Sequence, residues 1–213
     1  MKSWKYILTI SPLLLTLSSC MMLNNKAEAS DEIIEKQIDI EQIIELQASS
    51  DLIIVISPSN TDKKIVIRGS ENVVEALNLE YDGHRCLSAS LKLGTTFRYQ
   101  SDEQKVHLYI SSDDISHFTC SSGANIKVVG TLNSETDLNV KAMSGGLISF
   151  ENIESPCITV KSLSGGCVRI DNVITENLKV QSHTGGVIQV SGTTNSICKQ
   201  GDTFLINTNN LNL

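Results

Sequence analysis

The side chains that most often do chemistry in proteins are scattered through this chain of 213 residues. Its four histidines have no neighbour at a spacing that would make a zinc site; they are His84, His107, His117 and His183. We therefore predict that the protein holds no metal ion and no cofactor, and we interpret each histidine as a surface or loop residue.

The six cysteines do not indicate a metal site either. Cys20 ends an N-terminal leader described below, and the remaining five are Cys86, Cys120, Cys157, Cys167 and Cys198. No pair of them has metal-ligand spacing. One disulfide and none are both left open, because connectivity cannot be read from a sequence. We expect Cys120 to lie inside the fold as a small apolar residue.

Two lysines could contact a charged partner. Lys141 and Lys161 are 20 residues apart, and the outward positions around them are basic or neutral, with no cluster of carboxylates. They would form a basic stripe that could meet an anionic glycan or a lipid headgroup, and the simpler interpretation is a solvated sheet face. The formal net charge of −7 argues against a nucleic-acid partner.

Four apolar or aromatic residues could also contact a partner. Phe97 and Tyr99 form the aromatic cluster of the chain, which we interpret as internal packing, with a ligand-contacting loop as the alternative. Met143 and Leu163 share an outward position with His183, which suggests a partner surface or self-association into a homo-oligomer.

The elements that position these candidates come from a repeated stretch. Ser-Gly-Gly or a close variant recurs with its first glycine at intervals of 22, 20 and 20 residues, at Gly123, Gly145, Gly165 and Gly185. Apolar residues alternate within each unit, as in Ile148 and Phe150, which indicates short strands. A fixed period of this size is typical of a repeat fold. We therefore predict an all-β, single-stranded parallel β-helix, or solenoid, with coils of about 20 residues.

The register of the repeat makes three further predictions. Ile148, Val168 and Ile188 should pile up in one interior column. The first glycine of each unit, at Gly123, Gly145, Gly165 and Gly185, should be a corner with positive φ. The second glycine should be less constrained, because Ala124 replaces it in one unit.

A further column contains asparagine and glycine. Asn152 and Asn172 fall with Gly130 and Gly192 in one column of the alignment. Because both residue types reach positive φ easily, we predict corners there. An asparagine ladder along the axis is the competing interpretation of Asn152 and Asn172.

The N-terminus indicates export. Residues 1–19 combine an early positive charge with an apolar run too short to span a bilayer, which is typical of a cleaved signal. The end of this run, Leu17-Ser18-Ser19-Cys20, resembles the lipobox of bacterial lipoproteins, in which the cysteine is lipidated. We predict a lipoprotein signal peptide over 1–19, a lipidated Cys20 with a flexible tether over 20–37, and a β-helix domain over 38–213, with helix or strand left open for 32–37.

The lipobox, the serial Ser-Gly units and the opening stretch from Ile43 to Ile56 together resemble the head GIN domain, a bacterial family described as auto-transporter adhesins. The resemblance covers about Ile38 to Ile206. It implies a right-handed parallel β-helix in the envelope of a Bacteroidetes-like bacterium, and it implies no catalytic residues.

These observations favour a non-enzymatic, lipid-anchored envelope protein that acts as an adhesin or scaffold, held on the membrane by its N-terminal lipid, with the outer membrane as its location. The partner would be a glycan or an envelope or host protein. The alternative is a polysaccharide-binding or polysaccharide-degrading β-helix. Lyases of that type need acidic metal ligands clustered on an outer sheet, whereas the outward positions here are basic and neutral.

Overall fold

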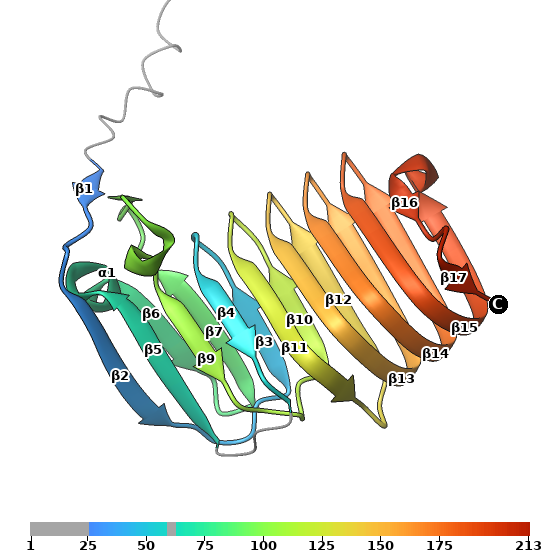
Figure 1. The fold of residues 1–213 in the computed structure, drawn as a ribbon, viewed down its shortest axis with the longest axis horizontal. Coiled ribbons are helices and arrows are strands. Elements are labelled where there is room, and N and C mark those ends of the chain that lie inside the picture. Colours follow the sequence, from blue (N-terminus) through green and yellow to red (C-terminus); the bar gives the residue numbers. More distant parts are fainter. Residues whose placement is uncertain (1–25, 59–62) are drawn as a thin grey trace, which may run out of the picture.

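The structure is a computed structural model that describes residues 26–58 and 63–213. Strands make up 61% of the chain and build a parallel β-solenoid of about five turns, which confirms the predicted fold class. The coils stack along the long axis of the molecule (Figure 1). Within the described residues, no helix is long and apolar enough to cross a membrane.

The elements follow one another in two groups. The N-terminal group consists of β1 (Ala27–Glu28), β2 (Ile33–Asp39), β3 (Glu45–Ala48), β4 (Ile53–Ile56), β5 (Lys64–Ser70), α1 (Glu71–Glu75), β6 (Leu77–Tyr81), β7 (Cys86–Leu91), β8 (Phe97–Arg98), η1 (Asp102–Gln104) and β9 (His107–Ile110). The repeat group consists of β10 (His117–Cys120), β11 (Asn125–Asn133), β12 (Leu138–Met143), β13 (Leu147–Leu163), β14 (Cys167–His183), β15 (Val187–Gly201), η2 (Thr203–Leu205), β16 (Ile206–Asn207) and β17 (Leu211–Asn212).

The repeat coils lie in parallel register, one directly over the next. Ile148 pairs with Val168, and Val168 pairs with Ile188. All three side chains are fully buried, which confirms the predicted interior column. Across the core, the rings of Phe118 and Phe150 meet edge to face with centroids 5.2 Å apart, a favoured aromatic geometry.

Each coil has further bends inside its long strand. In β13 buried and unburied residues alternate, but the alternation is interrupted at Glu151-Asn152 and again at Pro156-Cys157, where two successive residues are not buried. Because a regular strand alternates strictly, each interruption marks a bend that starts a new face. The coil therefore has three faces, separated by these two bends and by the Ser-Gly turn.

The Ser-Gly turns use two left-handed residues each. The predicted positive φ of the first glycine is confirmed, with φ between 75° and 81° at Gly123, Gly145, Gly165 and Gly185. The preceding residue, such as Ser164 at φ 49°, is also left-handed, which the sequence interpretation missed. Positive φ at both central residues is the signature of a type I′ turn.

The prediction for the second glycine was wrong. Gly146, Gly166 and Gly186 are the sterically restricted positions, because a Cβ added to any of them would lie within 2.1–2.5 Å of backbone atoms in the preceding coil. Nothing lies within 4 Å of a Cβ added at Gly165. The first glycine is therefore required for its φ, and the second for close approach.

The predicted positive φ at Asn152 and Asn172 was also wrong, because neither residue is left-handed. Instead Asn172 donates a hydrogen bond from Nδ2 to Oδ1 of Asn152 over 3.2 Å, so the competing ladder interpretation holds. Gly130 and Gly192 do have positive φ. They lie next to β-bulges that shift them out of the asparagine column, so that Gly192 pairs with Val173.

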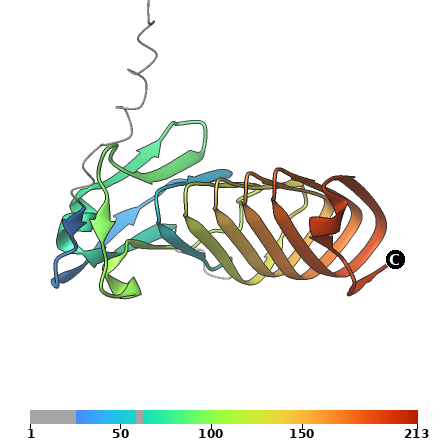
Figure 2. The same cartoon turned by 90° about the horizontal axis from the view of Figure 1, so that it is seen from above.

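The N-terminal half does not follow chain order in space. The coil of β3 and β4 lies between the β7/β9 coil and the β10/β11 coil. Beyond it, β6 pairs with β7, β5 with β9 and β2 with β5, all antiparallel. These strands and α1, which buries Val73 and Val74, close that end of the solenoid. Figure 2 shows them, blue to green, gathered at the end opposite the yellow-to-red coils.

The boundary predicted between tether and domain needs correction. Residues 20–37 were expected to be a flexible tether, but β2 begins at Ile33 and β1 pairs with β8. The region 32–37 left open is therefore mainly strand. The physical reason is that the antiparallel edge of β5 is available to pair with β2 over seven residues. Cys20 and the signal segment 1–19 lie outside the described residues.

The C-terminal tail covers part of the last coil. β16 and β17 pair with β15 at Ile188 and Gly192. Among the described residues, the stretch of β15 from Ile197 onward pairs only with β14. Ile197 is accordingly only partly buried.

Candidate functional site

Two sequence candidates, Lys141 and Lys161, lie side by side on one outer sheet. This surface, which we call the lysine face, is formed by β3, β10, β12 and the C-terminal parts of β13 and β14. Its outward residues are Glu45, Gln47, His117, Thr119, Asn139, Lys141, Thr159, Lys161, Lys179 and Gln181.

Alternation along each strand positions these side chains. Val140 and Ala142 are buried in β12, so Asn139 and Lys141 point outward. The parallel register then places Lys141 directly beside Lys161. Adjacent strands of a sheet are about 4.8 Å apart, so the two lysine side chains leave the sheet from neighbouring positions.

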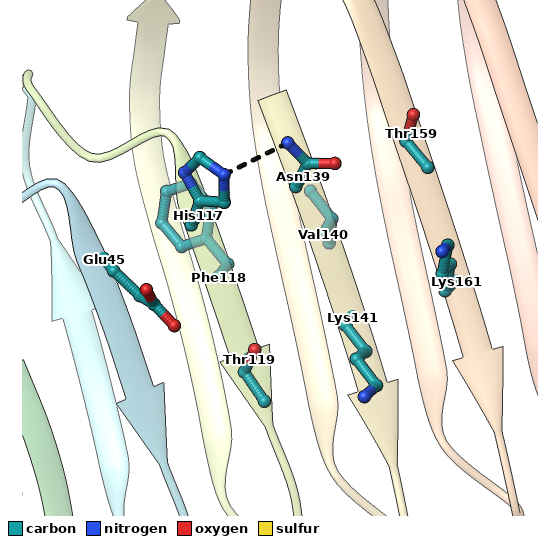
Figure 3. A pocket seen from close by; sticks show the side chains of 9 residues that line it. All are labelled: Glu45, His117, Phe118, Thr119, Asn139, Val140, Lys141, Thr159 and Lys161. Atoms are coloured by element: carbon teal, nitrogen blue, oxygen red, sulfur yellow. Dashed lines mark hydrogen bonds between the residues drawn. The ribbon is translucent and has the colours of Figure 1, made fainter. Parts of the chain in front are cut away.

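The lysine face is hollowed between β3 and β13. The hollow has a volume of about 270 Å³. Figure 3 shows the side chains that line it, with those of Lys141 and Lys161 on neighbouring strands. Its lining residues are Glu45, His117, Phe118, Thr119, Asn139, Val140, Lys141, Thr159 and Lys161. Apart from Glu45, its ionisable groups are two lysines and one histidine.

His117 is fixed by two hydrogen bonds. Nδ2 of Asn139 lies 3.3 Å from Nε2 of His117, a contact marked in Figure 3. Oγ of Ser116 lies 3.0 Å from Nδ1. Because the amide nitrogen is a donor, Nε2 accepts, and the ring then donates from Nδ1 to Ser116. These two contacts orient the imidazole ring on the lysine face.

The lysines of this face are not neutralised by neighbouring carboxylates. Within the described residues, no carboxylate oxygen lies within 4.0 Å of the ammonium nitrogen of Lys141, Lys161 or Lys179. On the next face of the same coils, Lys127 pairs with Glu151 at 3.6 Å and Arg169 with Asp171 at 2.6 Å. The lysine face therefore carries three lysines without a carboxylate partner among the described residues.

A second hollow adjoins the first and carries the opposite charge. It has a volume of about 810 Å³ and shares His117 and Asn139 with the lysine hollow. Its ionisable groups include Asp113, Asp114, Glu135 and Asp137. Among the described residues, no group of three histidine, cysteine or acidic side chains could hold a metal ion. The acidic hollow therefore bounds the lysine face on one side.

The apolar candidates fall in two places. Met143 pairs with Leu163, and Leu163 with His183, so these residues border Lys141 and Lys161 on the lysine face. Phe97 and Tyr99 do not join them. Their ring centroids lie 6.3 Å apart in and beside β8, and both rings pack partly buried against the core.

Tyr99 has an environment that suppresses its ionisation. Burial, with a smaller contribution from the charge of Asp51, raises the pKa of Tyr99 to about 12. Nζ of Lys105 lies 5.9 Å from the centre of its ring, within the range of a cation–π contact. The geometry is that of a packing residue rather than of an exposed platform.

The described cysteines are all free. Cys120 is buried, Cys198 is exposed, and Cys86, Cys157 and Cys167 are intermediate. Burial raises the pKa of Cys120 to about 11, which matches its predicted place inside the fold. These thiols do not contribute to the lysine face.

Sequence reasoning treated His117 as an isolated surface residue. The interval of 22 residues between Gly123 and Gly145 also separates His117 from Asn139 and Thr119 from Lys141. Extending that interval backward would have placed β10 on the same sheet as the lysines.

Comparisons with known proteins identify the domain. The model of the family described as "Putative auto-transporter adhesin, head GIN domain" matches residues 42–199. This chain belongs to the head GIN domain family. No curated protein matches it.

Solved structures share the architecture of this head GIN domain. One is a protein described as a putative lipid binding protein from Parabacteroides distasonis, with a TM-score of 0.68 and 13% identity over 83% of this chain and 74% of that chain. Another is a putative adhesin from Bacteroides fragilis, with a TM-score of 0.54 and 14% identity over 87% of this chain and 99% of that chain. At such identities the likeness shows the fold.

Proposed function

We propose that this head GIN domain is a non-enzymatic binding protein of the cell envelope, which acts as an adhesin or as a scaffold for an envelope partner. The observation that carries the proposal is the lysine face, where polar and basic side chains repeat at the same positions on successive coils. A surface built in this way can contact an extended partner at several equivalent points. The described adhesin function of the family supports the same conclusion.

The proposed location is the outer membrane, with the chain anchored through lipid on Cys20. The lipobox-like Leu17-Ser18-Ser19-Cys20 supports this proposal, because two or more acyl chains give stable anchoring. The neighbours from Parabacteroides and Bacteroides described as lipid binding and adhesin proteins support an envelope context. In this proposal the segment 26–32 connects the lipid anchor to β2, at the closed N-terminal end of the solenoid.

The lipid anchor and the orientation of the protein are tested first. Palmitate labelling and membrane fractionation of the wild type and of Cys20→Ser should show lipid and membrane association only in the wild type. Protease treatment of intact cells then distinguishes surface exposure from a periplasmic orientation. Equal membrane association of Cys20→Ser and the wild type would overturn the anchor.

Binding is tested with the purified full-length protein in detergent on immobilised glycans and extracellular-matrix proteins. We expect saturable binding to at least one partner class. Absence of binding across the panel, together with an intact envelope after deletion of the gene, would contradict the proposal. Turnover in depolymerisation assays on acidic polysaccharides would overturn its non-enzymatic part.

A further inference from the structure

We infer that the lysine face is an anion-binding site for a sulfated or acidic polysaccharide, with Lys141 and Lys161 as its charge centre. This inference rests on the proposed binding function and names the ligand class. It is carried by the parallel register, which places Lys141 beside Lys161 on a hollowed face of the sheet.

Two faces of the same coils differ in whether a carboxylate lies beside their basic side chains. Arg169 has Asp171 within 2.6 Å, two residues along its own strand, and Lys127 has Glu151 within 3.6 Å. The lysine face has no such partner within 4.0 Å of Lys141 or Lys161 among the described residues. Together with Lys179 on the next strand, the two lysines make this face locally positive.

Because no carboxylate of the described residues lies between them, the ammonium groups of Lys141 and Lys161 repel each other. Lys141 and Lys161 are direct neighbours on parallel strands, and like charges directly opposite one another destabilise a sheet. An anionic group bound between the two ammonium groups would remove the repulsion and gain charge-assisted hydrogen bonds.

Hydrogen-bonding groups surround the charge centre. Thr119 pairs with Lys141 on the side of β10, and Gln181 pairs with Lys161 on the side of β14. Thr159 lines the same hollow. These hydroxyl and amide groups suit the hydroxyl groups of a sugar, and they extend the site over four successive strands along the solenoid axis. A linear polysaccharide can lie along that row.

The charge around the face favours a narrow chain over a broad anionic surface. The acidic hollow at Asp113, Asp114, Glu135 and Asp137 bounds the lysine face on one side, and Glu45 lies within the face on β3, two strands from Lys141. A membrane with anionic lipids would meet these carboxylates and the net charge of −7, whereas a polysaccharide lying on the row from Thr119 to Gln181 meets the lysines first. An anionic ligand is therefore attracted by the lysines of this face and not by the net charge of the protein.

The test measures binding of dextran sulfate, with uncharged dextran as the reference, to the full-length protein. We expect saturable binding of dextran sulfate that weakens as salt is added, and no binding of dextran. The double variant Lys141→Gln/Lys161→Gln should bind at least on the order of tenfold more weakly. Lys161→Arg should retain binding, because it keeps the charge and adds donors.

The matched control is Lys127→Gln/Arg169→Gln, which removes the same charge from the neighbouring face. We expect it to bind dextran sulfate as the wild type does. Equal weakening in both double variants would overturn the site, because binding would then follow overall charge. Circular dichroism on each variant checks that the coil is intact, as expected for exposed positions.

Vesicles and the glycan panel separate the remaining outcomes. Binding to phosphatidylglycerol vesicles but not to dextran sulfate would overturn the polysaccharide ligand in favour of a membrane surface. If the wild type and Lys141→Gln/Lys161→Gln bind another member of the panel equally well and neither binds dextran sulfate, this inference fails while the proposed adhesive function stands.

Discussion

Gly166 lies against the backbone of Ala142 in the preceding coil. A Cβ at Gly166 would come within 2.5 Å of the carbonyl carbon and oxygen of Ala142, closer than carbon atoms pack in protein interiors. Gly165, the residue before it, has open space around it and a φ of 75°. Two adjacent glycines are therefore needed for two different physical reasons.

Substitution of the two glycines by alanine should separate these reasons. Gly165→Ala should lower the free energy of unfolding by about 1 kcal/mol, because alanine is strained at positive φ. Gly166→Ala should lower it by roughly 2–3 kcal/mol, because the backbone of Ala142 must move to admit a methyl group. Denaturant unfolding measures both, with Ser149→Thr on the solenoid surface as a near-neutral control. A change at Gly166→Ala no larger than that of the control would contradict the close approach.

Hydroxyl groups inside the second bend should also contribute to stability. Thr175 is buried, and its Oγ1 lies 3.2 Å from the carbonyl oxygen of Pro156 in the preceding coil and 3.3 Å from that of Asn177. Thr175→Val keeps the shape but removes the donor, so we expect a loss of about 1–3 kcal/mol in the free energy of unfolding. Thr159→Val, on the lysine face, is the matched control and should change stability by only a few tenths of a kcal/mol. Similar values for the two variants would mean that the buried hydroxyl groups contribute nothing.

The regular half of the fold was predictable because its coils are nearly equal in length. Equal coils place Ile148, Val168 and Ile188 in one column, and the same period places Lys141 beside Lys161. The ion pair between Lys127 and Glu151 was not predictable in this way. Glu151 lies at a bend, where the alternation of inward and outward residues breaks.

The N-terminal half was not predictable because its neighbours in space are distant in sequence. β3 pairs with β7 on one side and with β10 on the other, and no fixed interval links these strands. The antiparallel strands β2, β5 and β6, which close the N-terminal end of the solenoid, could not be predicted from the 20-residue repeat for the same reason. The role of the second glycine was missed because Ala124 occupies the same position in one unit, which suggested that a Cβ is tolerated there. Whether a Cβ fits depends on how closely the backbone of the adjacent coil approaches.

Asn72, in α1, holds the segment that precedes β2. Its Oδ1 accepts a hydrogen bond from the backbone nitrogen of Ser30 over 3.0 Å, and its Nδ2 donates to the carbonyl oxygen of Glu28 over 2.9 Å. Asn72→Ala should therefore increase hydrogen exchange of residues 26–32 while the exchange of the coils from β12 to β15 stays unchanged. Asn78→Ala, which removes only an exposed side-chain contact to Glu80, is the control. Unchanged exchange at residues 26–32 would show that this segment is held by other contacts.

Tyr99 should make the stability of the protein depend on pH in the alkaline range. Its pKa is raised to about 12 in the fold, against about 10 in an unfolded chain, so the native state favours the neutral phenol. The contribution of this group to stability is complete below pH 10 and is lost as the pH rises from 10 to about 12.

Tyr99→Phe cannot ionise at this position, so its unfolding free energy should fall less steeply than that of the wild type over that pH window. Tyr109→Phe, which removes the hydroxyl of a more exposed ring, is measured beside it as the comparison variant. Unfolding in urea across the window gives the slopes, and tyrosinate absorbance of the native protein reports the titration directly. Identical slopes for Tyr99→Phe and the wild type would show that the Tyr99 hydroxyl is solvated in the native state, and the cluster of Phe97 and Tyr99 would then be open to a ligand.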